Sequence, residues 1–101
     1  MTRVIVSRQA DADVDDMLER PYERAGIAVV ERYAGDLQAI YDRLATFPDS
    51  GAPRPILGPN MRIAVLSPYL VLYDHAPNDE TVTIVRVLDG RRNITRQLVR
   101  P

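Results

Sequence analysis

The segment from Met61 to Asn93 constrains the fold of this chain more than any other part of the sequence. It contains three short apolar runs, each rich in β-branched or aromatic residues and so typical of a strand: Ile63–Leu66, Leu70–Tyr73 and Val82–Leu88. Ser67-Pro68 is too short a link for anything but a hairpin, and residues 76–79 (Ala-Pro-Asn-Asp) are suited to a second turn. The segment therefore predicts a three-stranded antiparallel meander.

The N-terminal residues predict a strand followed by the start of a helix. Arg3–Ser7 is a short apolar run, and either Ser7 or Asp11 can begin a helix after it. The first turns of that helix are rich in aspartate, at positions 11, 13, 15 and 16. Negative charge there is favourable because it faces the positive end of the helix dipole.

An apolar face continues through this first helix. Its residues recur at helical spacing: Val14, Met17, Leu18, Tyr22 and Ala25. Because Pro21 interrupts the helix, we expect a kink there and an end near Arg24. Gly26 is then expected to be its left-handed cap.

The second helix has the most regular pattern in the chain. Its apolar stripe is spaced by three or four residues throughout: Ile27, Val30, Ala34, Leu37, Tyr41, Leu44 and Phe47. Such a stripe predicts a core-facing helix. Pro48 to Gly51 ends it, and Ala52–Asn60, with three prolines and a glycine, is expected to be a loop.

The order of these elements predicts the fold class. Residues 1–101 are expected to form a single α+β domain of order β-α-α-β-β-β. Because a helical hairpin returns the chain to the end that it left, we expect the first strand to lie antiparallel in the same sheet. The hairpin would then pack on one face of a small antiparallel sheet. Nothing in the chain remains to cover the other face, which predicts a surface for a partner.

Composition excludes several kinds of chemistry. The chain has no cysteine and one histidine, His75, so disulfides, thiolate catalysis and a zinc site are not expected. All thirteen basic residues are arginine, which leaves no lysine for Schiff-base catalysis. No apolar run approaches the roughly 20 residues of a membrane span. We expect a cytoplasmic protein without cofactor, metal or membrane.

Charge is distributed unevenly. Residues 1–50 carry six arginines against ten acidic residues, whereas residues 51–101 carry seven against four. Arg62 and Arg86 lie in or beside apolar strands. They either face solvent or form an anion-binding patch with Arg91 and Arg92. A basic patch commonly meets nucleic acid or an acidic partner, and a merely solvated tail is the other interpretation.

No catalytic constellation stands out. Gly51 and Gly58 lie in a proline-rich connection that no helix follows, so they do not form a phosphate loop. Ser67, Asp74 and His75 lack the sequence of a nucleophile elbow. We interpret His75 as a solvent-facing or hydrogen-bonding residue. The sequence does not require an enzyme.

Several local strings, taken in order, resemble one family. They are residues 12–16 (ADVDD), 23–26 (ERAG), 31–33 (ERY), 44–51 (LATFPDSG), 61–62 (MR), 69–73 (YLVLY) and 84–92 (IVRVLDGRR). The chain resembles the RelE/ParE superfamily of toxins from bacterial type II toxin–antitoxin systems, and more closely its ParE branch. It departs from the family at Pro21, where members usually carry an aliphatic or aromatic residue. It also departs at Asp89, where many carry histidine.

The resemblance implies a toxin in a hetero-oligomer with a small ParD-like antitoxin, whose C-terminal segment wraps over the helical hairpin and the sheet. Operator DNA would be contacted only indirectly, through the antitoxin. Candidate antitoxin-binding residues are Val14, Leu18, Tyr22, Tyr33, Tyr41, Tyr69 and Tyr73. Candidate target-binding residues are Arg62, Arg86, Arg91 and Arg92.

The target depends on the branch. ParE-like members poison DNA gyrase by binding, without catalytic groups of their own, and this is the favoured function. RelE-like members cut messenger RNA on the ribosome, which needs proton transfer. At their functional positions this chain has Arg62, Ala64, Leu70 and Arg91 or Arg92, and no tyrosine follows Tyr73. Arginine is a poor proton carrier. A messenger-RNA endonuclease is therefore the alternative, and a non-toxic antitoxin-binding module is the second alternative.

Overall fold

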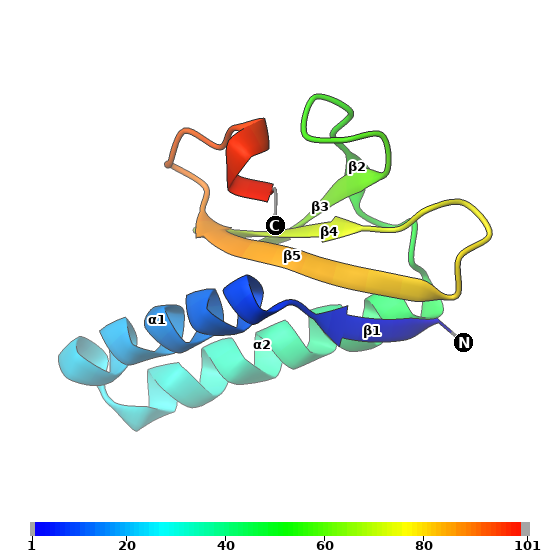
Figure 1. The fold of residues 1–101 in the computed structure, drawn as a ribbon. Coiled ribbons are helices and arrows are strands. Elements are labelled where there is room, and N and C mark those ends of the chain that lie inside the picture. The colour runs from blue at the N-terminus through cyan, green and yellow to red at the C-terminus, as the bar shows by residue number, and fades with distance from the viewer. Residues whose placement is uncertain (1, 100–101) are drawn as a thin grey trace.

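The computed structural model describes residues 2–99, with side chains described everywhere except at residues 20–25. Its elements are β1 Arg3–Val6, α1 Arg8–Ala25, α2 Ile27–Thr46, β2 Ala52–Pro53, β3 Met61–Leu66, β4 Tyr69–Asp74, β5 Thr81–Asp89 and the 3₁₀ helix η1 Arg96–Val99. Two helices pack on one face of a five-stranded mixed sheet of order β1-β5-β4-β3-β2 (Figure 1). The predicted α+β class, helical hairpin and β3-β4-β5 meander are confirmed.

The direction of β1 differs from the prediction. β1 pairs parallel to β5, with Arg3 opposite Thr81, so the expected antiparallel arrangement is wrong. The backbone N–H of Thr2 donates to the carbonyl of Ala45 (2.9 Å), which places the end of α2 beside the start of β1. The hairpin therefore returns the chain to where β1 began, so β3 runs in the same direction as β1. Two hairpin reversals then make β5 parallel to β1.

The connection after α2 contains a strand that was expected to be loop. Ala52 and Pro53 form β2, which pairs antiparallel with Ile63 and Arg62 at the edge of the sheet. Proline is tolerated on an edge strand because its missing N–H faces outward. The proline content therefore predicts an edge position rather than the absence of a strand.

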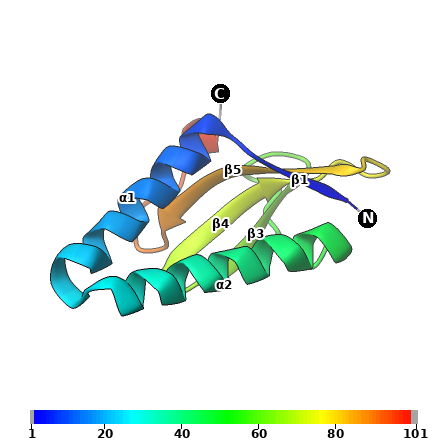
Figure 2. The ribbon, with the colours of Figure 1, turned by 90° about the horizontal axis from the view of Figure 1, so that it is seen from below.

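The main core lies between the helices and the sheet. Ser7 caps α1, because its Oγ accepts from the N–H of Ala10 (3.0 Å) and donates to the carbonyl of Val85 (2.9 Å). The helices meet at one end and diverge over the strands (Figure 2). The space between the two layers is filled by buried apolar side chains that include Met17, Leu37, Ile40, Leu44, Val71, Tyr73, Val82 and Ile84.

The buried face of α2 is narrower than the predicted stripe. Leu37 and Leu44 are buried as expected, together with Ile40, which the stripe omitted. Ile27 and Phe47 are 60% and 63% exposed. Ile27 is the first residue of α2, and Phe47 directly follows its last. Because an α-helix has 3.6 residues per turn, a stripe that repeats every 3.5 residues drifts around the helix, so its two ends turn away from the core.

The turn between the helices also differs in detail from the prediction. α1 continues past Pro21 to Ala25. Gly26 has the expected positive φ of 85°, but its ψ of −176° is extended rather than left-handed helical, and α2 begins at the next residue. Gly26 is therefore a sharp reversal between two helices, not a left-handed cap.

The opposite face of the sheet is covered, contrary to the sequence prediction. Leu57, Met61, Ile63 and Leu72 form a second buried cluster there, and Ile94 and Val99 pack against it. The loop after β2 and the C-terminal segment with η1 lie over this face (Figure 1). The sequence prediction of a partner surface on an uncovered sheet face is therefore wrong.

Candidate functional site

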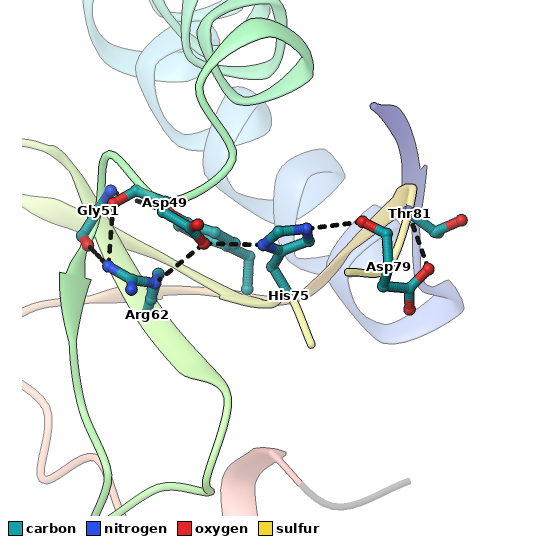
Figure 3. A network of polar contacts seen from close by, with 7 residues as sticks. Asp49, Gly51, Arg62, His75, Asp79 and Thr81 are labelled. Carbon is teal, nitrogen blue, oxygen red and sulfur yellow. Dashed lines mark hydrogen bonds and ion pairs between the residues drawn. The ribbon is translucent and has the colours of Figure 1, made fainter. Parts of the chain in front are cut away.

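Arg62 belongs to a polar network that joins three segments of the chain (Figure 3). Its Nη1 donates to the carbonyls of Asp49 (2.9 Å) and Gly51 (2.7 Å), and its Nε lies 3.5 Å from the Asp49 carboxylate. The same carboxylate oxygen lies 2.8 Å from Nδ1 of His75. Arg62 therefore holds the loop after α2 against β3.

His75 occupies the other end of this network. Its side chain is only 7% exposed. Nδ1 faces the Asp49 carboxylate, and Nε2 lies 2.8 Å from the carbonyl of Asp79. Because both partners only accept hydrogen bonds, both ring nitrogens must donate, and only the imidazolium can do so. His75 is thus the hydrogen-bonding residue that the sequence predicted, in a buried position.

The ionisation of His75 follows from this geometry. Burial alone would lower its pKa, but the hydrogen bonds to Asp49 and Asp79 and the negative charges of both aspartates outweigh it, so the pKa is raised above its usual value. A raised pKa in the folded state stabilises the fold below the unfolded pKa of about 6.5, and this stabilisation is lost as pH rises through the folded pKa.

The His75 network predicts a pH dependence of stability. Between about pH 5.5 and pH 8.5 we expect the free energy of unfolding of the wild type to fall by more than that of His75→Gln, whose side chain cannot titrate. Urea titrations of both proteins at the two pH values measure this difference. Identical pH dependence in the two proteins would show that the imidazolium contributes nothing.

Arg86 is half-buried, on the side of the sheet opposite Arg62. Nε and Nη2 of Arg86 donate to the carboxylate of Asp13 in α1 (2.7 and 3.0 Å), and Nη1 donates to the carbonyl of Leu98 (3.1 Å). The side chains of Arg86 and Asp13 are only 16% and 15% exposed. The hydrogen bonds to Asp13 raise the pKa of Arg86 above its already high ordinary value. Arg86 therefore ties α1 to the C-terminal segment.

The four predicted target-binding arginines do not form one patch. Arg62 pairs with Tyr73 in the sheet, whereas Arg86 pairs with Leu72, so their side chains point to opposite faces. Arg91 and Arg92 follow β5 and are both exposed. The Arg91 side chain is 82% exposed and pairs with Asp89 (2.6 Å). Of these four arginines, Arg91 and Arg92 are the exposed ones, whereas Arg62 and Arg86 are half-buried.

Two of the candidate tyrosines form an aromatic pair at the surface. The rings of Tyr33 and Tyr69 meet edge to face, with centroids 6.1 Å apart and an interplanar angle of 85°. Tyr33 lines a groove of about 510 Å³ between α2 and the edge of β3. Tyr69 lines a smaller hollow of about 210 Å³ between α1 and β5, to which Arg92 also contributes. The pair stands between two concave surfaces.

The other candidate antitoxin-binding residues differ in accessibility. Val14 and Leu18 are half-buried against the core, and Leu18 also lines a shallow depression with Val30. Tyr73 is fully buried. Its hydroxyl accepts from the N–H of Gly51 (2.8 Å), so in this structure Tyr73 is a core residue. The side chain of Tyr22 lies outside the described residues.

Tyr41 carries a buried hydroxyl that has no hydrogen-bond partner among the described residues. Burial, helped by the negative charge of Asp11, raises the pKa of Tyr41 to about 12. A buried hydroxyl without a partner costs about 1 kcal/mol or more. Its ring contributes to the core, so Tyr41 acts mainly in packing.

Removing the Tyr41 hydroxyl is therefore expected to stabilise the protein. Tyr41→Phe should raise the free energy of unfolding by about 1 kcal/mol. The matched change Tyr73→Phe should lower it by about 1 kcal/mol, because the N–H of Gly51 loses its acceptor. Urea unfolding of both variants is the measurement. A loss of stability in Tyr41→Phe would mean that the hydroxyl has a partner in solution.

The groove beside α2 is the concave site that the sequence did not indicate. Its lining includes Arg32, Tyr33, Ile40 and Arg43 from α2, with Val65 and Leu66 from β3. The spacing of Arg32 and Arg43 on one helix face was a visible signal. The exposure of the β3 edge was not, because it depends on how short β2 is.

Within residues 2–99, neither helix is long and apolar enough to cross a membrane.

A family model described as "ParE toxin of type II toxin-antitoxin system, parDE" matches residues 4–94. This chain belongs to the ParE toxin family. It is 36% identical to Toxin ParE3 of Caulobacter vibrioides over 98 residues. The matched region covers 97% of this chain and 96% of that protein. It is 28% identical to Toxin ParE1 of Mycobacterium tuberculosis, over 96% of this chain and 98% of that protein.

A similar fold is found in a solved structure titled "Chromosomal ParDE TA system from P. aeruginosa". The two chains superpose with a TM-score of 0.72 at 21% identity, over 88% of this chain and 96% of the other. The solved structure shows that the helical hairpin and mixed sheet recur there. The family match and the relatives confirm the resemblance to the ParE branch that the sequence suggested.

Proposed function

We propose that this ParE-family toxin inhibits DNA gyrase by binding to it, and that a ParD-like antitoxin neutralises it in the cytoplasm. The family match over residues 4–94 carries the proposal. It is supported by the state of the side chains that could move a proton. His75 is buried with both ring nitrogens engaged, and arginine stays charged at physiological pH. An inhibitor that acts by binding needs no acid/base pair.

Arg91 and Arg92 are the proposed contacts with the target. Both lie in the turn after β5, at the exposed end of the sheet. Arg62 and Arg86, by contrast, are half-buried and bonded to distant parts of the chain. Arg91 bonds to its near neighbour Asp89, but 82% of its side chain stays exposed. Exposed arginines suit an acidic protein surface or a phosphate, both of which a gyrase–DNA complex presents.

Expression of this chain without an antitoxin tests the function. We expect DNA synthesis in the bacterial cells to stop before protein synthesis, when both are followed by label incorporation. Purified toxin should then trap gyrase on cleaved plasmid. An immediate stop in translation would instead support the messenger-RNA endonuclease, and unimpaired growth would support a non-toxic antitoxin-binding module.

Arg92→Ala tests the proposed target surface. We expect about tenfold less gyrase inhibition, equivalent to about 1.4 kcal/mol of binding energy. The melting temperature should not change, because substitutions on an exposed surface rarely affect stability. Arg8→Ala, at the exposed start of α1, is the control and should inhibit as the wild type does. Full inhibition by Arg92→Ala would place the target contact elsewhere.

A further inference from the structure

The segment after β5 presents an outer surface that is polar throughout. Its apolar side chains face inward, because Ile94 and Val99 pack against the second buried cluster of the sheet. The residues after Asp89 include four arginines and no aspartate or glutamate. The exposed side chains of this segment are therefore either cationic or neutral and polar: Arg91, Arg92, Asn93, Thr95, Arg96 and Gln97. We call these six side chains the arginine surface.

Hydrogen bonds within the chain hold the backbone of the arginine surface in place. The N–H of Arg92 donates to the carbonyl of Asp89 (3.1 Å), and the N–H of Leu98 donates to the carbonyl of Thr95 (3.0 Å). Nη1 of Arg86 donates to the carbonyl of Leu98 (3.1 Å), which ties η1 to β5. Because this backbone is already ordered, binding to another molecule costs less conformational entropy.

Two of the three arginines are available to a partner. The Arg91 guanidinium already pairs with Asp89 (2.6 Å), whereas neither Arg92 nor Arg96 forms an ion pair with another described side chain. Arg92 borders the hollow to which three aspartates contribute, and Arg96 does not line it. Arg96 is therefore the arginine of this surface that the acidic residues of the hollow affect least.

Charge is separated between the two sides of the sheet. Residues 8–46, which form both helices, carry nine acidic residues against five arginines. These helices lie on one face of the sheet, and the C-terminal segment with η1 lies over the other (Figure 1). The arginine surface is therefore a local concentration of positive charge on a protein whose net charge is −1. Such a surface attracts an anionic partner and orients the molecule toward it.

The side chains of this surface suit a phosphodiester backbone better than an acidic protein. Interfaces between proteins usually centre on a buried aromatic or arginine anchor surrounded by apolar contacts, and residues 91–97 expose no apolar side chain. Contacts with the DNA backbone come from arginine and from neutral donors such as threonine, asparagine and glutamine. Arg91 and Arg96 are five positions apart, so their backbones are at most about 18 Å apart, the length of about five phosphates along one strand.

We infer that the arginine surface binds the backbone phosphates of duplex DNA directly, so that the toxin contacts the DNA held by gyrase as well as the enzyme. This inference rests on the proposed function: it names the chemical partner of the exposed arginines and adds Arg96 as a contact residue. Binding is independent of base sequence, because phosphate contacts carry no sequence information. It is weak for the toxin alone and is strengthened when gyrase holds DNA beside the toxin.

The salt dependence of DNA binding by the purified toxin tests this inference without gyrase. Fluorescence anisotropy of a short labelled duplex would be followed at several salt concentrations. With two available arginines, the logarithm of the affinity should fall against the logarithm of salt concentration with a slope of about −1.8. Arg96→Gln should reduce the slope to about −0.9 and weaken binding about eightfold at about 0.1 M salt.

The matched control is Arg8→Gln, an exposed arginine at the start of α1 on the helix side of the sheet. It should bind DNA with the affinity and slope of the wild type. Circular dichroism of both variants checks that they fold. A slope that Arg96→Gln leaves unchanged, or that Arg8→Gln reduces equally, would overturn the inference.

Competition separates DNA from other anionic partners. A poly-glutamate peptide of the same total charge should displace the labelled duplex less well than unlabelled duplex does. Equal displacement would assign the arginine surface to an acidic protein, and tighter binding of single-stranded RNA would assign it to RNA. Trapping of gyrase on cleaved plasmid without any DNA binding by the toxin would overturn only this inference. DNA binding without trapping would overturn the proposed function and leave the DNA contact standing.

Discussion

Asp13→Ala is expected to destabilise the protein by about 3–5 kcal/mol, a large part of the stability of a domain of this size. The Asp13 carboxylate accepts from Nε and Nη2 of Arg86 and from the backbone N–H of Val87 (3.0 Å). Without it, a charge that is only 16% exposed loses its counterion. The N–H of Val87 loses its acceptor in the same change.

The position of Asp13 explains why so much depends on it. β1 pairs with β5 only as far as Val6 and Ile84. Beyond that point no strand among residues 2–99 lies beside this edge of β5. The Asp13 side chain of α1 instead accepts from the N–H of Val87, which a strand would otherwise have bonded. Asp13 therefore completes the sheet and anchors the helix to it.

Urea unfolding would measure the effect of Asp13→Ala, with two comparisons to separate its causes. Asp13→Asn keeps an acceptor for Val87 and removes the charge, so its cost should be about half as large. The double variant Asp13→Ala/Arg86→Met removes both charges. It should be more stable than Asp13→Ala alone, because no unpaired charge remains buried. A loss below about 1 kcal/mol in Asp13→Ala would contradict this account.

Gly51→Ala is expected to have the second largest effect, a loss of about 3 kcal/mol. A Cβ at this position would lie 2.6 Å from the Tyr73 hydroxyl and 2.7 Å from the carbonyl oxygen of Ile63. The carbonyl belongs to the β3 backbone and cannot move aside without disturbing the sheet. Relief of the clash would break the bond from the Gly51 N–H to Tyr73 and displace the carbonyl that Arg62 binds.

Gly35→Ala is a control of opposite sign. A Cβ at Gly35, in the middle of α2, meets nothing within 4 Å, and alanine favours a helix interior over glycine by about 1 kcal/mol. Thermal unfolding of both variants should therefore show one lower and one higher midpoint than the wild type. Equal shifts in the same direction would show that the environment of Gly51 is not special.

The meander was predictable because its signals are local. Ser67-Pro68 and the turn before β5 mark hairpins without reference to the rest of the chain, and β3, β4 and β5 formed within two residues of the predicted bounds. The direction of β1 was not predictable in this way. It depends on which end of the sheet a 20-residue helix reaches. The spacing of apolar residues along the sequence does not indicate this.

The covering of the second sheet face was missed for a related reason. Leu57 belongs to a two-residue apolar run with Ile56 in a proline-rich segment, and Ile94 is an isolated apolar residue in a polar one. Without periodicity, a single apolar side chain gives no sign that it will be buried. Only the folded chain brings these residues over Met61 and Leu72.

Arg62 and Arg86 lie on opposite faces of the sheet because of one irregularity in the strand pairing. Strict alternation from Val82 and Ile84 would place Arg86 on the helix-facing side, together with Arg62. The pairing between β4 and β5 shifts at Leu72 and Tyr73, and this bulge redirects Arg86 to the opposite side. Bulges carry no reliable signature in a single sequence, so sequence alone could not separate the buried arginines from the exposed ones.

The parallel pair of β1 and β5 also determines how much of the chain must be synthesised before the sheet can close. Ser7, at the end of β1, bonds to Val85, 78 positions later. During synthesis the first strand therefore has no strand to pair with until β5 has left the ribosome. The turn that bears Arg91 and Arg92 comes later still. A chain whose synthesis stops before β5 can neither close its sheet nor display the turn that we propose as the target contact, so we expect it to be unable to act on that target.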